Sequence, residues 1–470
     1  MSRGFDQIER RTPATRREFL ATGSLLAGGL ALGDLLRAEA AAGIGSSDKA
    51  VVNIHLDGGP PHLDMIDLKP EAPVEIRGEF SPIASRIPGF SICELLPKLA
   101  AAADKLIFIR SLIGSVGAHD AFQCQSGFGE QDLKSIGGRP ALGSVLARLC
   151  GSTRDQAPAF VDLMQGRPFV RNSARPGFLG PAFGPFRPDI SKMFSRPLEE
   201  GMKRELAARG ADHATSLSLI DGISVNRLGD RTALMREFDR FRRDIDASGM
   251  MDAMDGFTRQ AVGILTSGRF ADAMDLGKEE ERIIERYTLP DAGRAIDVAE
   301  TSEGASWPKK LLLARRLIEA GVRSVSLSLS DFDTHRANFQ RMRNLLPLLD
   351  HGLNAFLTDL AERGMLNDVS IVAWGEFGRT PTVDARSVGR HHWPSVGMAL
   401  LAGGGMRTAQ VIGRTDHYGG AAVARPVSYQ DVFATLYHNL GIDQGATRLT
   451  DPSGRPQMLL ESGQVIAEAV

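Results

Sequence analysis

The sequence predicts an α/β fold with a parallel central sheet. Two apolar runs, residues 322–330 and 369–374, have the composition of buried strands, and residues 340–363 between them have a helical period. This strand–helix–strand order is typical of parallel sheets, in which ligands bind beyond the carboxyl ends of the strands. Side chains that bind metal ions follow both runs directly. The same stretch therefore predicts the fold and the place of a site.

Other segments complete the predicted domain, which spans residues 43–470. Further strands are expected at 51–57, 106–110, 158–164, 396–402 and 410–413. Further helices are expected at 94–105 and 140–150 and from Ser428 to Gly441. Another is expected to begin after an N-cap at Ser306, with Pro308 in its first turn, and to end at Gly321. Ser428 and Asp431 are spaced as in a capping box.

The pattern changes between about residues 165 and 305. Residues 165–190 are rich in Gly, Pro, Phe and Arg and have no regular period. Amphipathic helices are then expected at 197–209, 229–247, 252–266 and 277–288, with no strand pattern between them. We therefore expect a helical insertion or cap on the α/β domain.

Residues 1–42 are predicted to be a twin-arginine signal peptide. Arg16 and Arg17 precede Phe19 and Leu20, an apolar run follows, and small residues at 38–42 offer cleavage sites. The run is too short and too interrupted for a good membrane span. The alternative is a chance arginine pair before an internal helix. We expect export by the twin-arginine (Tat) machinery to the periplasm or the extracellular space, without a stable membrane span after signal removal.

Composition excludes some classes of protein. The chain has 470 residues, of which 43% are apolar and 24% charged, enough to bury a large core. A net charge of −2 gives no basic field for nucleic acid. Cys93, Cys124 and Cys150 are too few for a disulfide framework, and three buried thiols are the expected alternative to one bridge.

Carboxylates and imidazoles follow several predicted strands. Each alone could be structural, as a turn cap, a helix N-terminal carboxylate or a surface histidine pair. Their shared place after parallel strands favours a metal site instead, and the residue types suit zinc, manganese or iron. The predicted metal ligands are Asp57, Asp331, Asp333, His335, Glu376 and His392.

Candidate catalytic residues lie on neighbouring loops. Ser115 and His119 follow strand 106–110, although no G-x-S-x-G elbow or phosphate loop is present. Arg379 could bind an anionic substrate oxygen through its planar guanidinium, or it could only orient Glu376. We therefore expect Ser115, His119 and Arg379 to be catalytic.

Six stretches of the chain resemble one exported family of unknown function, the domain-of-unknown-function family fifteen-oh-one. They are the twin-arginine leader, GGPPHLDMIDLKPEAP (58–73), FDTH (332–335), WGEFGRTP (374–381), GRHHWP (389–394) and LLAGGGM (400–406). The family is grouped with the alkaline phosphatase and sulfatase superfamily. The resemblance implies an alkaline phosphatase-like, three-layer α/β/α sandwich with a two-metal site at the strand ends.

The superfamily pattern also implies ligand roles. For the first ion, Asp331 and His335 fit its Asp-x-x-x-His spacing, Asp333 is the alternative carboxylate, and His392 matches its later histidine. For the second ion, Asp57 and Glu376 match two carboxylates, but Phe377 stands where the pattern has a histidine. The resemblance therefore implies an altered or one-metal site.

Two functions remain as expectations. The first is an exported metal-dependent hydrolase of phosphate or sulfate esters, with one or two zinc or manganese ions, a small anionic or carbohydrate-linked substrate, and His119 or His335 transferring protons. The alternative is a non-catalytic envelope protein that keeps the fold and binds an anionic or carbohydrate ligand. The surviving ligands favour the first, and the lack of an evident nucleophile favours the second.

Overall fold

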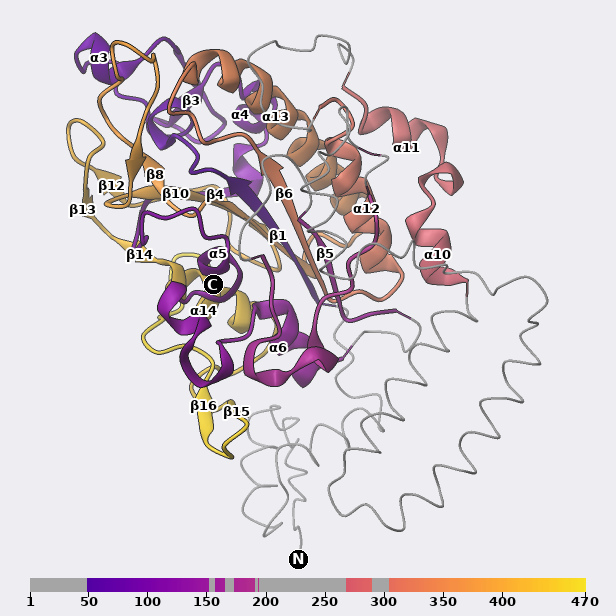
Figure 1. Cartoon of the computed structure of the whole chain (residues 1–470). Coiled ribbons are helices and arrows are strands. Elements are labelled where there is room, and N and C mark those ends of the chain that lie inside the picture. The colour runs from indigo at the N-terminus through magenta and orange to yellow at the C-terminus, as the bar shows by residue number, and fades with distance from the viewer. Residues whose placement is uncertain (1–48, 152–156, 165–172, 191–192, 194–267, 290–303) are drawn as a thin grey trace, which may run out of the picture. The chain divides into compact units, whose positions relative to one another are not determined.

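The structure is a computed structural model that describes residues 49–151, 157–164, 173–190, 193, 268–289 and 304–470 (Figure 1). Residues Asp48–Val470 form one compact unit. The predicted leader 1–42 and the predicted helices 197–209, 229–247 and 252–266 lie outside the described residues.

A mixed eight-stranded sheet forms the centre of this unit. Seven strands lie side by side, and β14 (Val427–Ser428) pairs with β4. Their order is β11 (Gln410–Ile412), β4 (Leu106–Ile113), β10 (Gly397–Gly403), β7 (Val369–Trp374), β1 (Ala50–Asp57), β6 (Ser324–Ser330) and β5 (Phe160–Leu163). β10 runs antiparallel to both of its neighbours, whereas every other pairing is parallel. The sequence predicted a parallel sheet, and β10 is the strand that departs from this prediction.

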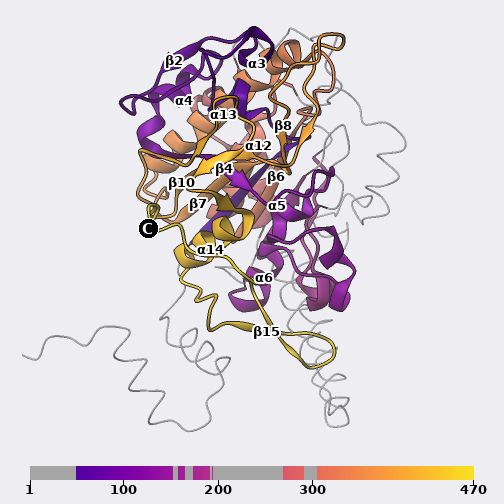
Figure 2. The same ribbon diagram turned by 90° about the vertical axis from the view of Figure 1, so that its left-hand side faces the viewer.

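Helices cover both faces of the sheet (Figures 1 and 2). One face packs against α4 (Pro97–Ala101), α12 (Pro308–Glu319) and α13 (Asn338–Glu362). The other packs against α5 (Phe122–Ser126), α6 (Leu142–Leu149) and α14 (Tyr429–Asn439). The predicted α/β class with a helix layer on each side is confirmed.

The alternation of side chains along β1 makes the two faces chemically different. Val52, Ile54 and Leu56 join the core under α12 and α13. The intervening Asn53, His55 and Asp57 point to the opposite face because successive strand side chains alternate. β6 lies beside β1 and presents Ser326, Ser328 and Ser330 opposite these three residues. One face of the sheet therefore carries a buried polar strip that ends at the carboxyl edge.

Helix ends follow the local sequence signals in most places. Ser428 Oγ accepts from Asp431 N at 3.1 Å, and Asp431 Oδ2 accepts from Ser428 N at 2.8 Å, so the predicted capping box is confirmed. The N-cap of α12 is Trp307 and not Ser306, because Pro308 takes the first helical position. The helix predicted at 94–105 is shorter: α4 ends at Ala101 and a 3-10 turn follows.

Short elements connect these layers. α3 (Val74–Arg77), α10 (Arg269–Met274) and α11 (Glu281–Arg286) are short helices. Four two-stranded sheets are β2–β3 (Pro82–Ala84, Ser91–Cys93), β8–β9 (Gly378–Arg379, His392–Trp393), β12–β13 (Arg414–Thr415, Ala422–Ala424) and β15–β16 (Arg448–Thr450, Pro456–Met458). The 3-10 turns span His62–Asp64, Ala103–Lys105, Glu130–Leu133, Ser135–Gly137, Gly177–Leu179, Pro181–Phe183 and Leu276–Lys278.

Within the predicted insertion, the helix expected at 277–288 is present as α11, preceded by the turn Leu276–Lys278. In the part of the chain that the structure describes, no helix is both long and apolar enough to cross a membrane. All three cysteines are described and free of disulfides: Cys93 and Cys124 are buried as expected, but Cys150 is exposed.

Candidate metal centre

Two groups of ligand-type side chains lie where β1, β6 and β7 end. Within each group, one potential ligand atom from every residue lies within 4.8 Å of those of the others. We call His119, Asp333, His335 and His392 the outer group, whose residues are all partly exposed. We call His55, Asp57 and Glu376 the inner group, whose residues are all buried. The predicted convergence of strand-end residues therefore gives two adjoining groups.

The outer group surrounds the carboxylate of Asp333. Its Oδ1 lies 3.1 Å from His335 Nε2 and 3.7 Å from His392 Nε2, and its Oδ2 lies 3.3 Å from His119 Nε2. The ring of His392 lies between the other two, with centroids 4.4 Å from His119 and 4.7 Å from His335. Three imidazoles from three separate segments of the chain therefore face one carboxylate.

Local strand pairing brings His392 to this place. β8 follows the end of β7 and pairs antiparallel with β9, which sets Arg379 opposite His392. His392 Nδ1 lies 3.1 Å from the carbonyl oxygen of Gly117, where it can only donate. Nδ1 therefore carries a proton. Nε2 is buried and has no hydrogen-bond partner among the described residues. This is the condition expected of a ligand nitrogen in the absence of its ion.

The charges around Asp333 suit metal binding. Burial opposes ionisation of Asp333, but its contacts with His119, His392 and Arg379 outweigh it and hold its pKa well below the usual range. Burial, together with the nearby Arg379 charge, lowers the pKa of His335 to about 4 against the attraction of Asp333. An ionised carboxylate and a neutral imidazole are the protonation states in which these groups bind metals.

The inner group is almost sealed from solvent. His55 Nε2 lies 3.5 Å from Asp57 Oδ1 and 3.6 Å from Glu376 Oε2. His55 and Glu376 have no exposed surface, and Asp57 is 8% exposed. Burial raises the pKa of Asp57. Burial works against protonation of His55, but its contacts with the two carboxylates prevail and raise its pKa.

His119 connects the two groups. Its Nδ1 lies 2.9 Å from Glu376 Oε1, and its Nε2 lies 3.3 Å from Asp333 Oδ2. Burial disfavours the charged ring, but hydrogen bonds to Asp333 and Glu376 outweigh it and raise the pKa of His119 to about 9. With a carboxylate at each ring nitrogen, the metal-free protein holds His119 as an imidazolium.

Arg379 holds the carboxylate of the outer group in place. It has no exposed surface, and its Nη2 pairs with Asp333 Oδ1 at 2.6 Å. Its remaining donors reach the carbonyl oxygens of Gly58, Gly59 and Arg390. The ion pair with Glu376 considered from the sequence is thus made with Asp333 instead. These contacts favour positioning of Asp333 over direct contact with a substrate anion.

Asp331 lies outside both groups, although the spacing to His335 matched the superfamily pattern. Its side chain is buried, and Oδ1 pairs with Nη2 of Arg341 in α13. Its backbone has a φ of 107°, which turns the chain sharply just after β6. The structure therefore brings Asp333, the alternative carboxylate, to the histidines.

Ser115 contacts the backbone beside the site. Its Oγ donates to the carbonyl oxygen of Glu376 at 2.6 Å and accepts from Gly117 N at 3.3 Å. Among the described contacts, Ser115 has none with the imidazoles of the outer group. The hydroxyl therefore connects the 115–119 loop to Glu376, two residues beyond the end of β7, and a role as nucleophile stays a prediction.

Buried contacts hold the site loops together. Arg390 binds Asp64 with two bonds of 2.8 Å, and Asn338 Nδ2 donates to the same carboxylate at 2.8 Å. Gly58 has a φ of +109°, and a Cβ there would lie 2.2 Å from Asp333 N, so only glycine lets the two loops approach so closely. This packing joins the chain after β1 to the loops that carry Asp333 and His392.

Sequence reasoning missed His55. It lies inside a strand, and an isolated histidine in an apolar run is more often structural than functional. The period of two along β1 was the available signal, because His55 and Asp57 are two residues apart and must share a face. Applied to VVNIHLD, that rule places an imidazole beside the predicted ligand Asp57.

The fold and site define a mixed α/β protein with two groups of candidate metal ligands at the carboxyl edge of its sheet. The chain belongs to the family described as "Protein of unknown function (DUF1501)", whose model matches residues 48–470. This confirms the family resemblance seen in the sequence. No curated protein matches the sequence.

Three solved structures are similar to this chain at low identity. The PsFucS1 sulfatase from Pseudoalteromonas sp. is 11% identical, with 88% of this chain and 72% of that chain covered and a TM-score of 0.36. The phosphonate monoester hydrolase of Agrobacterium radiobacter is 14% identical, with 84% and 74% covered and a TM-score of 0.29. The phosphonate monoester hydrolase SpPMH from Silicibacter pomeroyi is 13% identical, with 84% and 74% covered and a TM-score of 0.30.

Proposed function

We propose that this protein is an exported, metal-dependent hydrolase of phosphate or sulfate esters. The observation that carries the proposal is the outer group, in which His119, His335 and His392 surround Asp333 at a partly exposed place. A carboxylate with neutral imidazoles is a donor set that suits zinc or manganese. A second observation supports the fit: His392 Nε2 is buried without a hydrogen-bond partner among the described residues.

Asp333, His335 and His392 would hold the ion. A bound ion supplies polarisation of the ester oxygen or activation of a water molecule. Arg379 keeps Asp333 ionised and in place, because its guanidinium is fixed by backbone carbonyl oxygens as well as by the carboxylate. Because the Ser115 hydroxyl donates to the carbonyl oxygen of Glu376, water is the simplest nucleophile for this proposal.

His119 is the proton-transfer residue of this proposal. Its side chain is 27% exposed, so a ligand in the outer group can reach it. As an imidazolium it can donate a proton to the leaving alcohol oxygen, and its positive charge also attracts an anionic ester. The expected substrate is therefore a small anionic or carbohydrate-linked ester. Nucleic acid is not expected, and the route of export is the Tat machinery.

The proposal is tested with chelator-free protein and a panel of phosphate and sulfate esters. Wild-type protein should hydrolyse at least one class, chelation should abolish turnover, and added zinc or manganese should restore it. His335→Ala and His392→Ala should each lose the activity and the ion while keeping the fold. His351→Gln, on α13 and in contact with Lys98, is the matched control and should keep both.

The alternative of a non-catalytic binding protein is favoured by one observation, the engagement of the Ser115 hydroxyl with the Glu376 carbonyl oxygen. On that reading the ion and an anionic ligand bind without turnover. Wild-type protein that holds its ion and remains inactive on the whole panel would replace the hydrolase proposal with this one.

A further inference from the structure

We propose that His55 supplies the imidazole ligand for an ion held by the inner group, beside Asp57 and Glu376, the two carboxylates that the sequence resemblance already implies for a second ion. This inference rests on the proposed function in one respect, namely that the ion would lie beside a hydrolytic centre. The binding itself depends on the atoms of His55, Asp57 and Glu376. The sequence resemblance assigns no role to His55, and position 377, where the superfamily has a histidine, is a buried phenylalanine.

The interatomic distances match ligand separations better than hydrogen bonds. His55 Nε2 lies 3.5 Å from Asp57 Oδ1 and 3.6 Å from Glu376 Oε2. Hydrogen bonds from a ring nitrogen to an oxygen are about 2.7–3.2 Å long. Two ligands that each lie about 2.0–2.2 Å from a tetrahedral ion are about 3.4 Å apart. The three side chains are therefore spaced as if around an ion.

The inner group also leaves polar atoms without partners. Both ring nitrogens of His55 and Oε2 of Glu376 are buried and have no hydrogen-bond partner among the described residues. A structural histidine in a core ordinarily donates or accepts at least one hydrogen bond, since an unpaired buried polar group costs about 1–3 kcal/mol. His55 has none, and its Nε2 instead faces two carboxylates at 3.5 and 3.6 Å.

Charge provides a separate argument. Asp57 and Glu376 place two carboxylates in a space that excludes solvent, and burying uncompensated charge is costly. The interactions recorded for these carboxylates come from His55, His119 and the backbone N–H of Gly58. A divalent cation would balance both carboxylates at once.

Contacts to the other oxygen of Glu376 orient it for this role. Oε1 accepts from Gly58 N at 2.9 Å and lies 2.9 Å from His119 Nδ1, which leaves Oε2 on the side of His55. Fixing one carboxylate oxygen by hydrogen bonds while the other binds the ion is typical of metal ligands. Because His119 also contacts Asp333, one imidazole connects a carboxylate of the inner group with the carboxylate of the outer group.

The test measures ions per chain after equilibration with Zn²⁺ or Mn²⁺ and removal of excess metal. His55→Asn keeps a polar side chain but withdraws the atom at the Nε2 position, so we expect one ion fewer per chain than in the wild type. His55→Gln reaches that position with an amide oxygen and should bind the inner ion more weakly but measurably. The His335→Ala/His392→Ala double variant should lose the outer ion and keep the inner one. His351→Gln should match the wild type.

The outcomes separate this inference from the proposed function. If His55→Asn folds by circular dichroism and binds as many ions as the wild type, the inner site is wrong, while the hydrolase proposal stands. If the protein binds both ions but hydrolyses no ester, the hydrolase proposal fails and the inner site stands. If His55→Asn does not fold, anomalous diffraction from Zn²⁺-loaded wild-type crystals decides: a peak beside His55 Nε2 is expected, and its absence would overturn the inference.

Discussion

Asp333 is the residue on which the outer group depends. Its two carboxylate oxygens contact three imidazoles and the buried guanidinium of Arg379, so it is both the candidate ligand and the anchor of its neighbours. His119 differs from the other two histidines because a carboxylate lies at each of its ring nitrogens. Protonation of His119 would therefore be coupled to the binding of a metal ion by Asp333.

The first prediction concerns His119 in chelator-treated protein. Its folded-state pKa, about 9, is raised above the unfolded value of about 6.5. It therefore contributes stability that is fully present below pH 6.5 and is lost as pH rises through about 9. The free energy of unfolding of the wild type, measured by urea denaturation, should fall over that range relative to that of His119→Gln. Parallel pH profiles for the two proteins would show that His119 is neutral.

Most of the site could be predicted at the residue scale, and the exceptions have physical causes. Asp57, Asp333, His335 and Glu376 reach one edge of the sheet because they lie at or just beyond the carboxyl ends of β1, β6 and β7. His392 reaches it because β9 pairs with β8. Asp331 does not, because a turn with positive φ directs it to Arg341, and backbone angles of that kind are not visible in spacing. The ion pair of Arg379 with Asp333 depends on tertiary packing between loops distant in sequence.

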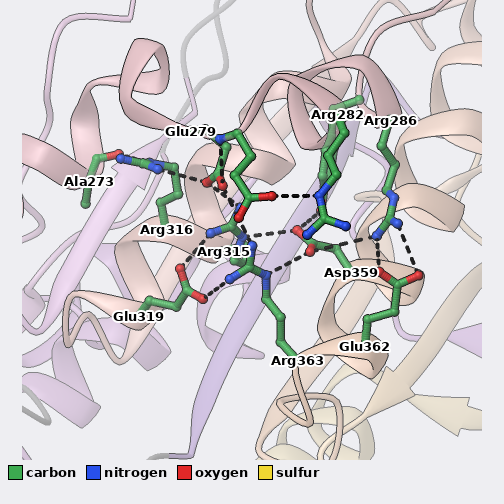
Figure 3. A network of polar contacts seen from close by, with 12 residues as sticks. Ala273, Glu279, Arg282, Arg286, Arg315, Arg316, Glu319, Asp359, Glu362 and Arg363 are labelled. Carbon is green, nitrogen blue, oxygen red and sulfur yellow. Dashed lines mark hydrogen bonds and ion pairs between the residues drawn. The ribbon is translucent and has the colours of Figure 1, made fainter.

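At the scale of elements, the segment 268–289 is attached to the α/β core by charged side chains (Figure 3). Glu279 Oε2 pairs with Arg315 of α12 at 2.6 Å and with Arg316 at 2.8 Å. Arg315 also pairs with Asp359 of α13 at 3.1 Å, and Asp359 accepts from Tyr287 OH at 3.0 Å. The network joins the end of the predicted insertion to the two helices that cover one face of the sheet.

The second prediction tests this network. Arg315 and Asp359 are each 1% exposed, and removing Arg315 takes a buried cationic partner from Asp359, for which Arg363 at 2.9 Å compensates only in part. Arg315→Ala should lower the free energy of unfolding by about 3 kcal/mol in urea denaturation. The matched control is Arg343→Ala on α13, which removes an exposed pair with Glu79 outside this network and should cost at most about 1 kcal/mol. Equal losses would show that burial does not govern the network.

Strands could be predicted more accurately than short elements. The predicted strand 369–374 agrees with β7 at both ends, since apolar β-branched composition marks buried strands well. The two-residue strands β8 and β9 were not predicted, because segments of that length have no measurable period. The antiparallel direction of β10 could not be predicted either, since the direction of a strand depends on its pairing, here with β4 and β7, and not on local sequence.

At the scale of the whole molecule, the predicted insertion separates two parts of one sheet. β5, an edge strand of the sheet, precedes the predicted insertion. α12 follows the insertion and leads into β6, which pairs with β5. The site itself draws on segments from His55 to His392, so its geometry depends on folding of the whole α/β domain. Export after folding, as the twin-arginine route allows, would let metal enter before the protein leaves the cell.

The third prediction concerns export. Changing Arg16 and Arg17 together to Lys should keep the full-length protein inside the cell, because the paired arginines are the expected recognition feature of the leader. Fractionation followed by mass spectrometry should find wild-type protein outside the cytoplasm, beginning near residue 43. Arg10 and Arg11, changed together to Lys, provide a matched control outside the motif. Normal export of the Arg16/Arg17 variant would show that the leader has been misinterpreted.

The central claim, that the outer group binds a metal ion, is tested most directly by elemental analysis of exported protein purified without chelator. The wild type should carry at least one zinc or manganese ion per chain, and His335→Ala/His392→Ala should carry one fewer because it lacks two of the ligands. Wild-type protein without metal, or a folded double variant with an unchanged metal content, would contradict the claim.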